Sequence, residues 1–117
     1  MQIFNALGMI METTQRNVRD EIKQAIASSS VVLFMKGEPR VPQCGFSAAA
    51  VKMLADVGVS DYAYVNVLED GQIREGIKAY SSWPTIPQLY INQEFIGGAD
   101  IMRELHESGE LSRLVSK

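Results

Sequence analysis

A single cysteine, Cys44, is the residue of this chain best suited to covalent or metal chemistry. It follows the segment Val41-Pro42-Gln43 and begins a predicted helix. At such a position, unsatisfied backbone N–H groups and the helix dipole stabilise a thiolate over a thiol. A thiolate is a nucleophile and a soft metal ligand. The alternative role is that of a small buried apolar residue, which a junction between a proline-containing loop and a helix disfavours.

Three residues after Cys44 the chain carries Ser47 and not a second cysteine. A dithiol oxidoreductase uses a cysteine there to attack the mixed disulfide left on the first, and a serine hydroxyl cannot do so. Any redox cycle must therefore use an external thiol, and we expect Ser47 to cap or hydrogen-bond within the first helical turn. Because a lone cysteine cannot form an internal disulfide, we expect a reducing compartment, with the cytosol as the first choice.

Composition predicts one folded domain without affinity for nucleic acid or membranes. The chain has 117 residues, of which 46% are hydrophobic, enough for one core but not for two ordinary domains. Its net charge is −3 and it has no run of Lys or Arg, so it lacks the basic surface that nucleic acids and anionic membranes require. Residues 1–12 are expected to be a flexible extension, without a signal-peptide pattern, and residues 13–117 to form the domain.

The first half of the domain is predicted to place Cys44 between a strand and a helix. Thr13 or Thr14 is expected to cap an initial helix that ends at the serines 28–30. The uninterrupted apolar run 31–35 predicts a strand buried on both faces, and residues 37–43 predict a loop. The helix after Cys44 should bury one apolar face and stop at a glycine; this face comprises Phe46, Ala50, Met53, Leu54 and Val57.

The second half of the domain is predicted to contain two helices and three strands. Residues 62–67 alternate in a strand pattern, and apolar residues at helical spacing follow between 73 and 80. Residues 88–91 and 94–96 flank Asn92-Gln93, which predicts a tight hairpin, and Asp100 can cap a final helix. The αβαβαββα order predicts an α/β thioredoxin fold, a three-layer sandwich with a four-stranded mixed sheet between helices.

Several motifs together resemble the monothiol glutaredoxins. The sequence Cys44-Gly45-Phe46-Ser47 matches the Cys-Gly-Phe-Ser signature of that family, and the resemblance extends from about residue 15 to the end of the chain. The further motifs occur in the family's order and spacing, which makes the combination specific. They are the segments 34–37, 42–43, 73–74, 83–89 and 97–100.

The resemblance implies a glutathione site with cations at one end. Glutathione has two carboxylates, an ammonium group and a peptide backbone, so its site should offer cations, an anion and an exposed strand edge. Lys36 and Arg74 correspond to the family's partners of the glycyl carboxylate, although either could be an ordinary solvated charge. Lys78, one turn after Arg74, is more consistent with a solvated charge than with a ligand contact.

The same resemblance assigns the other two parts of glutathione to backbone groups. Ile86, before a predicted cis Pro87, would pair through its backbone with the cysteinyl part. Ala99 and Asp100, at a helix N-terminus, would bind the γ-glutamyl end. Many relatives have a cysteine where this chain has Ala99, so an intramolecular disulfide with Cys44 is not expected.

The resemblance further implies that Cys44 carries a [2Fe-2S] cluster shared between two subunits. One cysteine cannot hold such a cluster, because each iron needs two ligands besides the bridging sulfides. The family supplies the others from the cysteine of a second subunit and from two glutathiones, so that a homodimer forms through the cluster. Implied partners are a BolA-like protein, an iron-sulfur scaffold and recipient proteins.

Two other roles remain open at this point. The chain could be a glutathione-dependent oxidoreductase that uses Cys44 alone, or an adaptor that only docks partners. A bacterial cytoplasm fits the composition best, but a mature protein of the mitochondrial matrix would look similar. We expect mainly a cluster carrier, with at most weak oxidoreductase activity.

Overall fold

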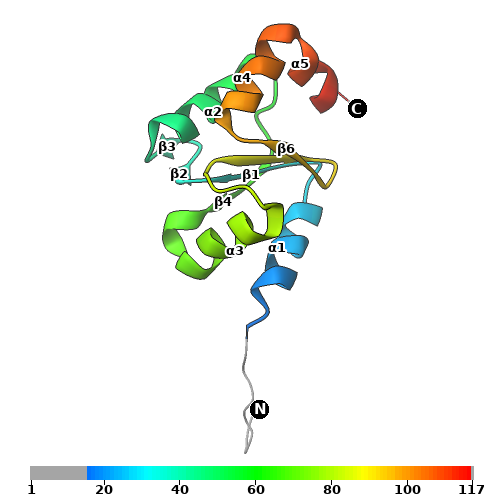
Figure 1. The fold of residues 1–117 in the computed structure, drawn as a ribbon. Coiled ribbons are helices and arrows are strands. Elements are labelled where there is room, and N and C mark those ends of the chain that lie inside the picture. Colours follow the sequence, from blue (N-terminus) through cyan, green and yellow to red (C-terminus); the bar gives the residue numbers. More distant parts are fainter. Residues whose placement is uncertain (1–15, 117) are drawn as a thin grey trace, which may run out of the picture.

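The computed structural model describes residues 16–116, so the predicted extension 1–12 and the predicted caps Thr13 and Thr14 lie outside the described residues (Figure 1). The described chain forms a mixed sheet with helices on both faces and a small separate hairpin. In chain order its elements are α1 (Val18–Ala27), β1 (Val31–Met35), β2 (Gly37–Glu38), β3 (Val41–Pro42), α2 (Gly45–Asp56), β4 (Ala63–Asn66), the 3-10 helix η1 (Val67–Glu69), α3 (Gly71–Ser81), β5 (Gln88–Ile91), β6 (Glu94–Gly97), α4 (Ala99–Ser108) and α5 (Glu110–Val115).

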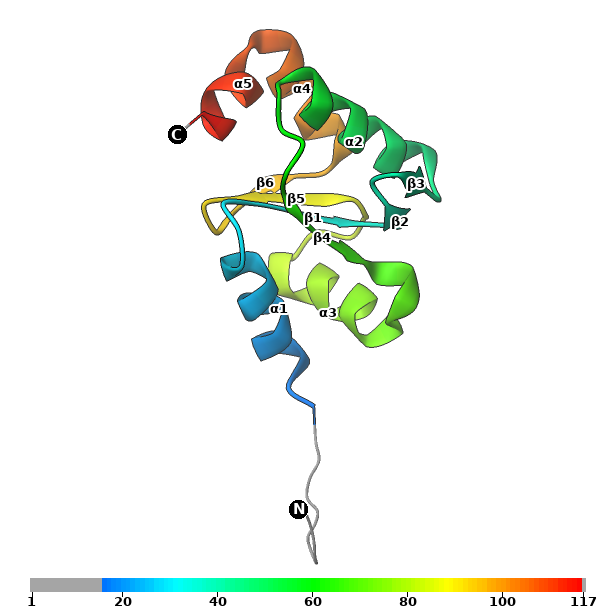
Figure 2. The same ribbon diagram turned by 180° about the vertical axis from the view of Figure 1, so that it is seen from behind.

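The four-stranded sheet has the order β4-β1-β5-β6. Strand β1 pairs parallel with β4 and antiparallel with β5, which in turn pairs antiparallel with β6. Helices α1 and α3 cover one face of this sheet, and α2 and α4 cover the other (Figure 2). These are the order and layers of the thioredoxin fold, as the sequence predicted.

The core has one half on each face of the sheet, because successive side chains of β1 point to opposite faces. Leu33 and Met35 belong to the half under α2 and α4, whereas Val32 and Phe34 belong to the half under α1 and α3. All five residues of β1 are buried, which confirms the predicted central strand.

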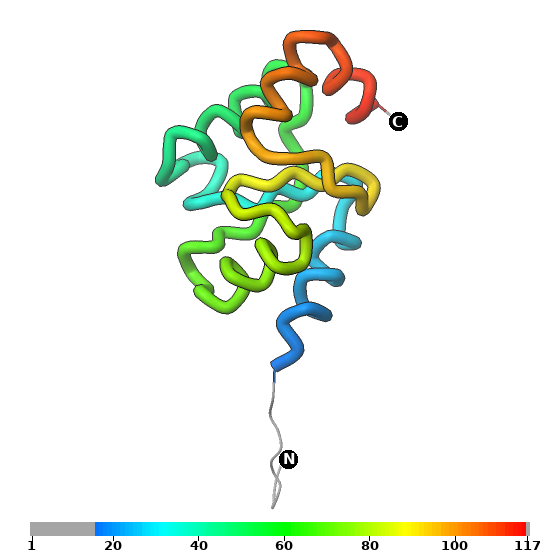
Figure 3. The backbone as a smooth tube through the Cα atoms, viewed as in Figure 1, coloured from blue at the N-terminus to red at the C-terminus, as the bar shows by residue number. Residues whose placement is uncertain are grey.

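Helices α1 and α5 lie at opposite ends of the molecule (Figure 3). None of the helices within residues 16–116 is long and apolar enough to span a bilayer.

The two hairpins differ in how well the sequence predicted them. In the turn between β5 and β6, Asn92 and Gln93 have φ values of 50° and 69°, the conformation that a two-residue type I′ turn requires. This hairpin is confirmed. Residues 37–43, predicted as a loop, instead contain the short antiparallel pair β2–β3. The predicted strand 62–67 ends at Asn66, whose side chain accepts a hydrogen bond from the Leu68 N–H and starts η1.

Of the four longer described helices, two begin with a side-chain cap and two do not. Asn17 caps α1 by accepting from the Asp20 N–H at 3.0 Å, and Asp70 caps α3 by accepting from the Gln72 and Ile73 N–H groups. Neither α2 nor α4 has a side-chain cap hydrogen bond. The cap predicted at Asp100 is wrong, because Gly98 is the N-cap of α4 and Asp100 lies in its first turn.

Candidate functional site

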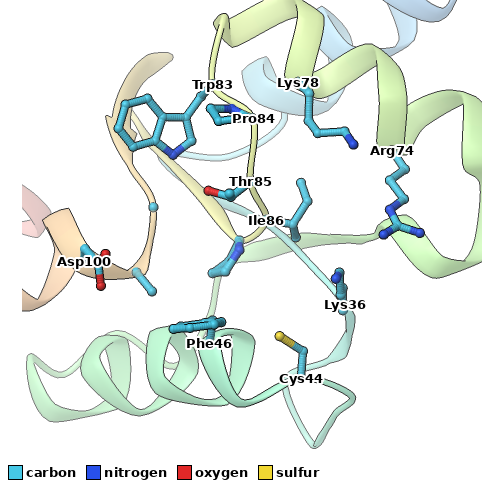
Figure 4. A pocket seen from close by; sticks show the side chains of 13 residues that line it. Lys36, Cys44, Phe46, Arg74, Lys78, Trp83, Pro84, Thr85, Ile86 and Asp100 are labelled. Atoms are coloured by element: carbon cyan, nitrogen blue, oxygen red, sulfur yellow. The ribbon is translucent and has the colours of Figure 1, made fainter.

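A cleft of about 360 Å³ lies across the ends of β1 and β5 and the N-termini of α2 and α4 (Figure 4). It brings together the six predicted site residues, although they come from distant parts of the chain. These are Lys36, Cys44, Arg74, Ile86, Ala99 and Asp100. The lining residues are Lys36, Cys44, Phe46, Arg74, Lys78, residues 83–87 and residues 98–100.

The hairpin before Cys44 is fixed to the sheet at its base. The Gln43 N–H donates to the Lys36 carbonyl at 2.9 Å, and the Gly37 N–H donates to the Asn66 side chain at 2.9 Å. Gly37 has a φ of 90°, and a Cβ atom there would lie 2.6 Å from the Val41 carbonyl oxygen. Only glycine fits this turn, which therefore holds Cys44 in extended conformation as the N-cap of α2.

The Cys44 thiol has a lowered pKa. Its partial burial on its own would raise the pKa, since burial disfavours the charged form. The backbone N–H groups of Ser47 and Phe46, the charge of Lys36 and the Ser47 hydroxyl together outweigh that effect. The sulfur is therefore prepared to act as a thiolate at the entrance of the cleft.

Ser47 is fully buried and has a tertiary role. Its hydroxyl oxygen accepts a hydrogen bond from the Lys36 N–H at 3.0 Å, which joins the first turn of α2 to the end of β1. Ser47 also forms the first-turn contact that the sequence predicted, because its hydroxyl hydrogen-bonds to Cys44. The contact with Lys36 adds to the hairpin in fixing Cys44 relative to the end of β1.

Three cations line one wall of the cleft. Lys36 follows β1, and Arg74 and Lys78 lie one turn apart on α3, with their side chains directed toward the same space (Figure 4). Lys78 pairs with Glu75 at 3.0 Å, whereas Lys36 and Arg74 form no ion pair with any residue in the described part of the chain. This wall can hold a carboxylate, and it includes Lys78, for which the sequence favoured a purely solvated role.

The loop 83–87 lies between the cationic wall and the N-terminus of α4, and it exposes a peptide to the cleft (Figure 4). The Ile86–Pro87 bond is cis, as the family resemblance predicted. Within residues 16–116, neither backbone group of Ile86 forms a backbone hydrogen bond, so both are available to an extended ligand. Beside this loop, Trp83 packs against Phe95 with ring centroids 5.8 Å apart.

The end wall is the N-terminus of α4. Ala99 and Asp100 occupy its first turn, where N–H groups have no partner within the helix. A Cβ atom on Gly98 would lie 3.1 Å from Trp83 Nε1 and 3.2 Å from the Pro87 carbonyl oxygen. The absence of a side chain at Gly98 thus lets the start of α4 approach the loop and complete the cleft.

Two residues of the site differ from expectation or were missed. Phe46, predicted on the buried face of its helix, is 61% exposed and lines the cleft. That prediction is wrong, because the Phe46 side chain faces the cleft and not the core (Figure 4). Gln88 was not singled out, although it is fully buried beneath the loop 83–87. Its signal in the sequence is a polar amide beginning an otherwise apolar strand.

The described residues contain no group of three or more His, Cys, Asp or Glu side chains that could hold a metal ion. Cys44 can contribute one thiolate ligand, and a metal centre at the cleft would need further ligands from outside the described residues. The cations, the open peptide and the helix N-terminus are suited to a small peptide with carboxylates.

Comparisons with known proteins agree with this geometry. Residues 31–96 match the family model described as glutaredoxin. The chain is 54% identical over 99 residues to the mitochondrial monothiol glutaredoxin-5 of Lachancea kluyveri, covering 83% of this chain and 69% of that protein. It is 46% identical over 117 residues to the mitochondrial glutaredoxin-related protein 5 of Danio rerio, covering 100% and 73%. The solution structure of reduced poplar apo GrxS14 matches with a TM-score of 0.73 and 46% identity, covering 85% and 90%.

Proposed function

Because the chain belongs to the glutaredoxin family, among its monothiol members, we propose that it binds glutathione in the cleft and carries a [2Fe-2S] cluster on Cys44. The cluster is shared by two subunits, and the protein acts in iron-sulfur cluster assembly and transfer. One observation carries this proposal: a thiolate-prone cysteine stands at the mouth of a cleft whose three walls match the three parts of glutathione.

The match to glutathione follows the length of the cleft. Lys36 and Arg74 would bind the glycyl carboxylate by charge and hydrogen bonds, with Lys78 able to add to the same wall. The Ile86 peptide groups would pair with the cysteinyl residue as an added strand. The first turn of α4, at Ala99 and Asp100, would receive the γ-glutamyl carboxylate, while the Asp100 side chain suits the ammonium group.

The cluster is the cargo of this site, and its ligand count requires a dimer. Each subunit would supply Cys44 and one glutathione thiol, so two subunits supply the four ligands that a [2Fe-2S] cluster needs. Because half of the ligands are exchangeable glutathiones, the cluster can leave by ligand exchange to a recipient. Cluster binding and dimerisation then form one equilibrium.

A second function, reduction of protein–glutathione mixed disulfides, is favoured by the lowered pKa of Cys44. The Cys44 thiolate would attack the glutathionyl sulfur, release the protein thiolate and become glutathionylated; a second glutathione thiolate would then release oxidised glutathione. The fixed β2–β3 hairpin and the serine at position 47 argue for cluster carriage as the main role, because Cys44 has neither a mobile loop nor a resolving partner.

Partners and location follow from the relatives. We propose an iron-sulfur scaffold as donor, recipient apoproteins and a BolA-like protein as partners. The expected cytosolic location finds no support among the relatives compared above, because those from L. kluyveri and D. rerio are named as mitochondrial proteins. We therefore propose the mitochondrial matrix, the alternative that the composition allowed.

The test is anaerobic reconstitution with iron, sulfide and glutathione, followed by visible absorbance and solution mass. A brown dimer is expected, and it should be absent without glutathione or in Cys44→Ser. Arg74→Met should weaken its formation, whereas Arg103→Met, an exposed arginine of α4 outside the cleft, should not. A colourless monomer that turns over glutathionylated substrates would replace the carrier role by the oxidoreductase role.

A further inference from the structure

Gln88 is a fully buried amide at the start of β5, directly beneath the loop 83–87. A buried amide without partners would cost free energy, so its hydrogen bonds identify what it holds in place. Its Nε2 donates to the Trp83 carbonyl at 3.2 Å and to the Thr85 carbonyl at 3.2 Å. Both amide hydrogens are therefore directed into the loop that carries the Ile86 peptide.

The oxygen of this amide contacts Tyr90, two residues further along the same face of β5. The Tyr90 hydroxyl donates to Gln88 Oε1 at 3.3 Å, and only 2% of the Tyr90 side chain is exposed. Burial raises the pKa of Tyr90 to about 12, and a hydrogen bond with the Ser81 side chain acts in the opposite direction. The Trp83 and Thr85 carbonyls can only accept, so the NH₂ group must face them and Oε1 faces the Tyr90 hydroxyl.

The loop has few other means of support. Pro84 and Pro87 have no N–H group, so two of its five residues cannot donate to any partner. The Trp83 N–H donates to the Ser81 hydroxyl at 3.1 Å, which holds the loop only where it leaves α3. Between that point and β5, Gln88 is the one residue within 16–116 whose side chain hydrogen-bonds to the loop.

We propose that Gln88 is a positioning residue for the ligand site: by holding the inward carbonyls of Trp83 and Thr85, it leaves the Ile86 peptide aimed at the cleft. This inference rests on the proposed glutathione site and adds to it a residue that does not touch the ligand. A purely structural role for Gln88 would contribute to stability but would not alter ligand affinity in the folded protein.

The test measures the glutathione dissociation constant by calorimetry in three variants and the unchanged chain. Gln88→Met keeps the length of the side chain but removes its donors, and Tyr90→Phe removes the hydroxyl that donates to the amide oxygen. Gln24→Met, at an exposed position on α1 away from the cleft, is the matched control. Urea unfolding and the amide NMR signals of Thr85 and Ile86 are recorded on the same samples.

We expect Gln88→Met to bind glutathione about tenfold more weakly, as for the loss of one peptide hydrogen bond to the ligand, and Tyr90→Phe about threefold more weakly. Both should shift the Ile86 amide signal, and Gln24→Met should change neither quantity. Folded Gln88→Met with unchanged affinity and signals would overturn the inference. If that variant does not fold, the same result in Tyr90→Phe would overturn it. Failure of the unchanged chain to bind glutathione would instead overturn the proposed function, and this inference with it.

Discussion

The helices on the two faces of the sheet begin in different ways. On the face without the cysteine, α1 and α3 start with Asn17 and Asp70, whose side chains accept hydrogen bonds from the first-turn N–H groups. On the other face, α2 and α4 start with Cys44 and Gly98, neither of which caps its helix with a side-chain oxygen. Both of these uncapped N-termini border the cleft.

This difference separates helix ends that serve the fold from helix ends that serve a ligand. First-turn N–H groups need an acceptor, and in α1 and α3 the chain itself provides it. In α2 the sulfur of Cys44 lies at the Phe46 and Ser47 N–H groups, which lowers its pKa, and in α4 the acceptor must come from outside. The first turn of a helix thus stabilises the fold on one face of the sheet and serves ligand binding on the other.

Substitution of Cys44 should have the largest effect, because it changes an uncapped N-terminus directly. Cys44→Ser and Cys44→Ala should both lose the coloured dimer completely. Serine, however, is a good N-cap, so the serine variant should unfold with a free energy about 1 kcal/mol higher than the alanine variant. Urea unfolding of the two cluster-free proteins measures this difference. Equal stability would mean that the start of α2 cannot accept an ordinary cap.

Removing the side-chain cap of α3 should destabilise the fold but leave glutathione binding unchanged. Asp70→Ala removes an acceptor of two N–H groups and the partner of Arg16 at 2.9 Å, so it should lower the urea midpoint clearly. Asp70→Asn keeps the capping oxygen and should fall between the alanine variant and the unchanged chain. Glutathione affinity should not change in either. A large loss of affinity would show that α3 also depends on its cap to serve the cleft.

The contribution of Asp70 should also depend on pH. Hydrogen bonds from Arg16 and from the Ile73 N–H hold the pKa of the Asp70 carboxyl below its usual range. Its charge therefore stabilises the fold above the pKa of an unfolded aspartate, and this stabilisation is lost as the pH falls through the lower folded value. The advantage of the unchanged chain over Asp70→Asn should shrink accordingly in acid.

Asn17→Ala should have a smaller effect, because Asn17 accepts a single hydrogen bond, from the Asp20 N–H, and carries no charge. We expect a loss of about 1 kcal/mol in the free energy of unfolding, measured by urea denaturation. Asn17→Ser, which can still cap, should recover most of it. A change in cluster formation by Asn17→Ala would contradict the separation of the two faces.

Lys36→Met should have the smallest effect, on the pH dependence of Cys44 alkylation. Lys36 is only one of several groups that lower the pKa of this thiol, after the backbone N–H groups of Ser47 and Phe46. Its removal should move the midpoint of the alkylation rate modestly to higher pH, since less thiolate is then present at a given pH. Lys52→Met, on the exposed side of α2, is the control and should leave the midpoint unchanged.

The elements that the sequence predicted correctly are those with a complete local pattern. The apolar run 31–35 can only be a strand buried on both faces in this context, and Asn92-Gln93 between two short strands favours a tight turn. The β2–β3 hairpin was missed because its strands have two residues each, too few for any periodicity. The cap Asn17 was missed because several polar residues precede α1, and only the fold decides which one starts it.

The site shows the same division. Motif spacing selected Cys44 and the residues that meet it in the cleft, but the spacing of Phe46 with Ala50 suggested burial for both. Only Ala50 is buried, because Phe46 lines the cleft at the open end of α2. Gln88 has a local pattern of a strand residue, and its hydrogen bonds depend on a loop whose path no local rule specifies. The sequence patterns therefore did not predict the roles of side chains whose contacts lie in other elements of the fold.

The tight turn at Gly37 has a consequence for how this chain tolerates change. A side chain at this position would collide with backbone atoms of Val41 and Gln43, so in a library of all single substitutions Gly37 should accept no other residue. Glu38 and Arg40, in the same hairpin, are exposed and should accept most residues. Among functional variants, the residue at position 37 should therefore stay glycine, whereas positions 38 and 40 at the tip of the same hairpin should vary freely.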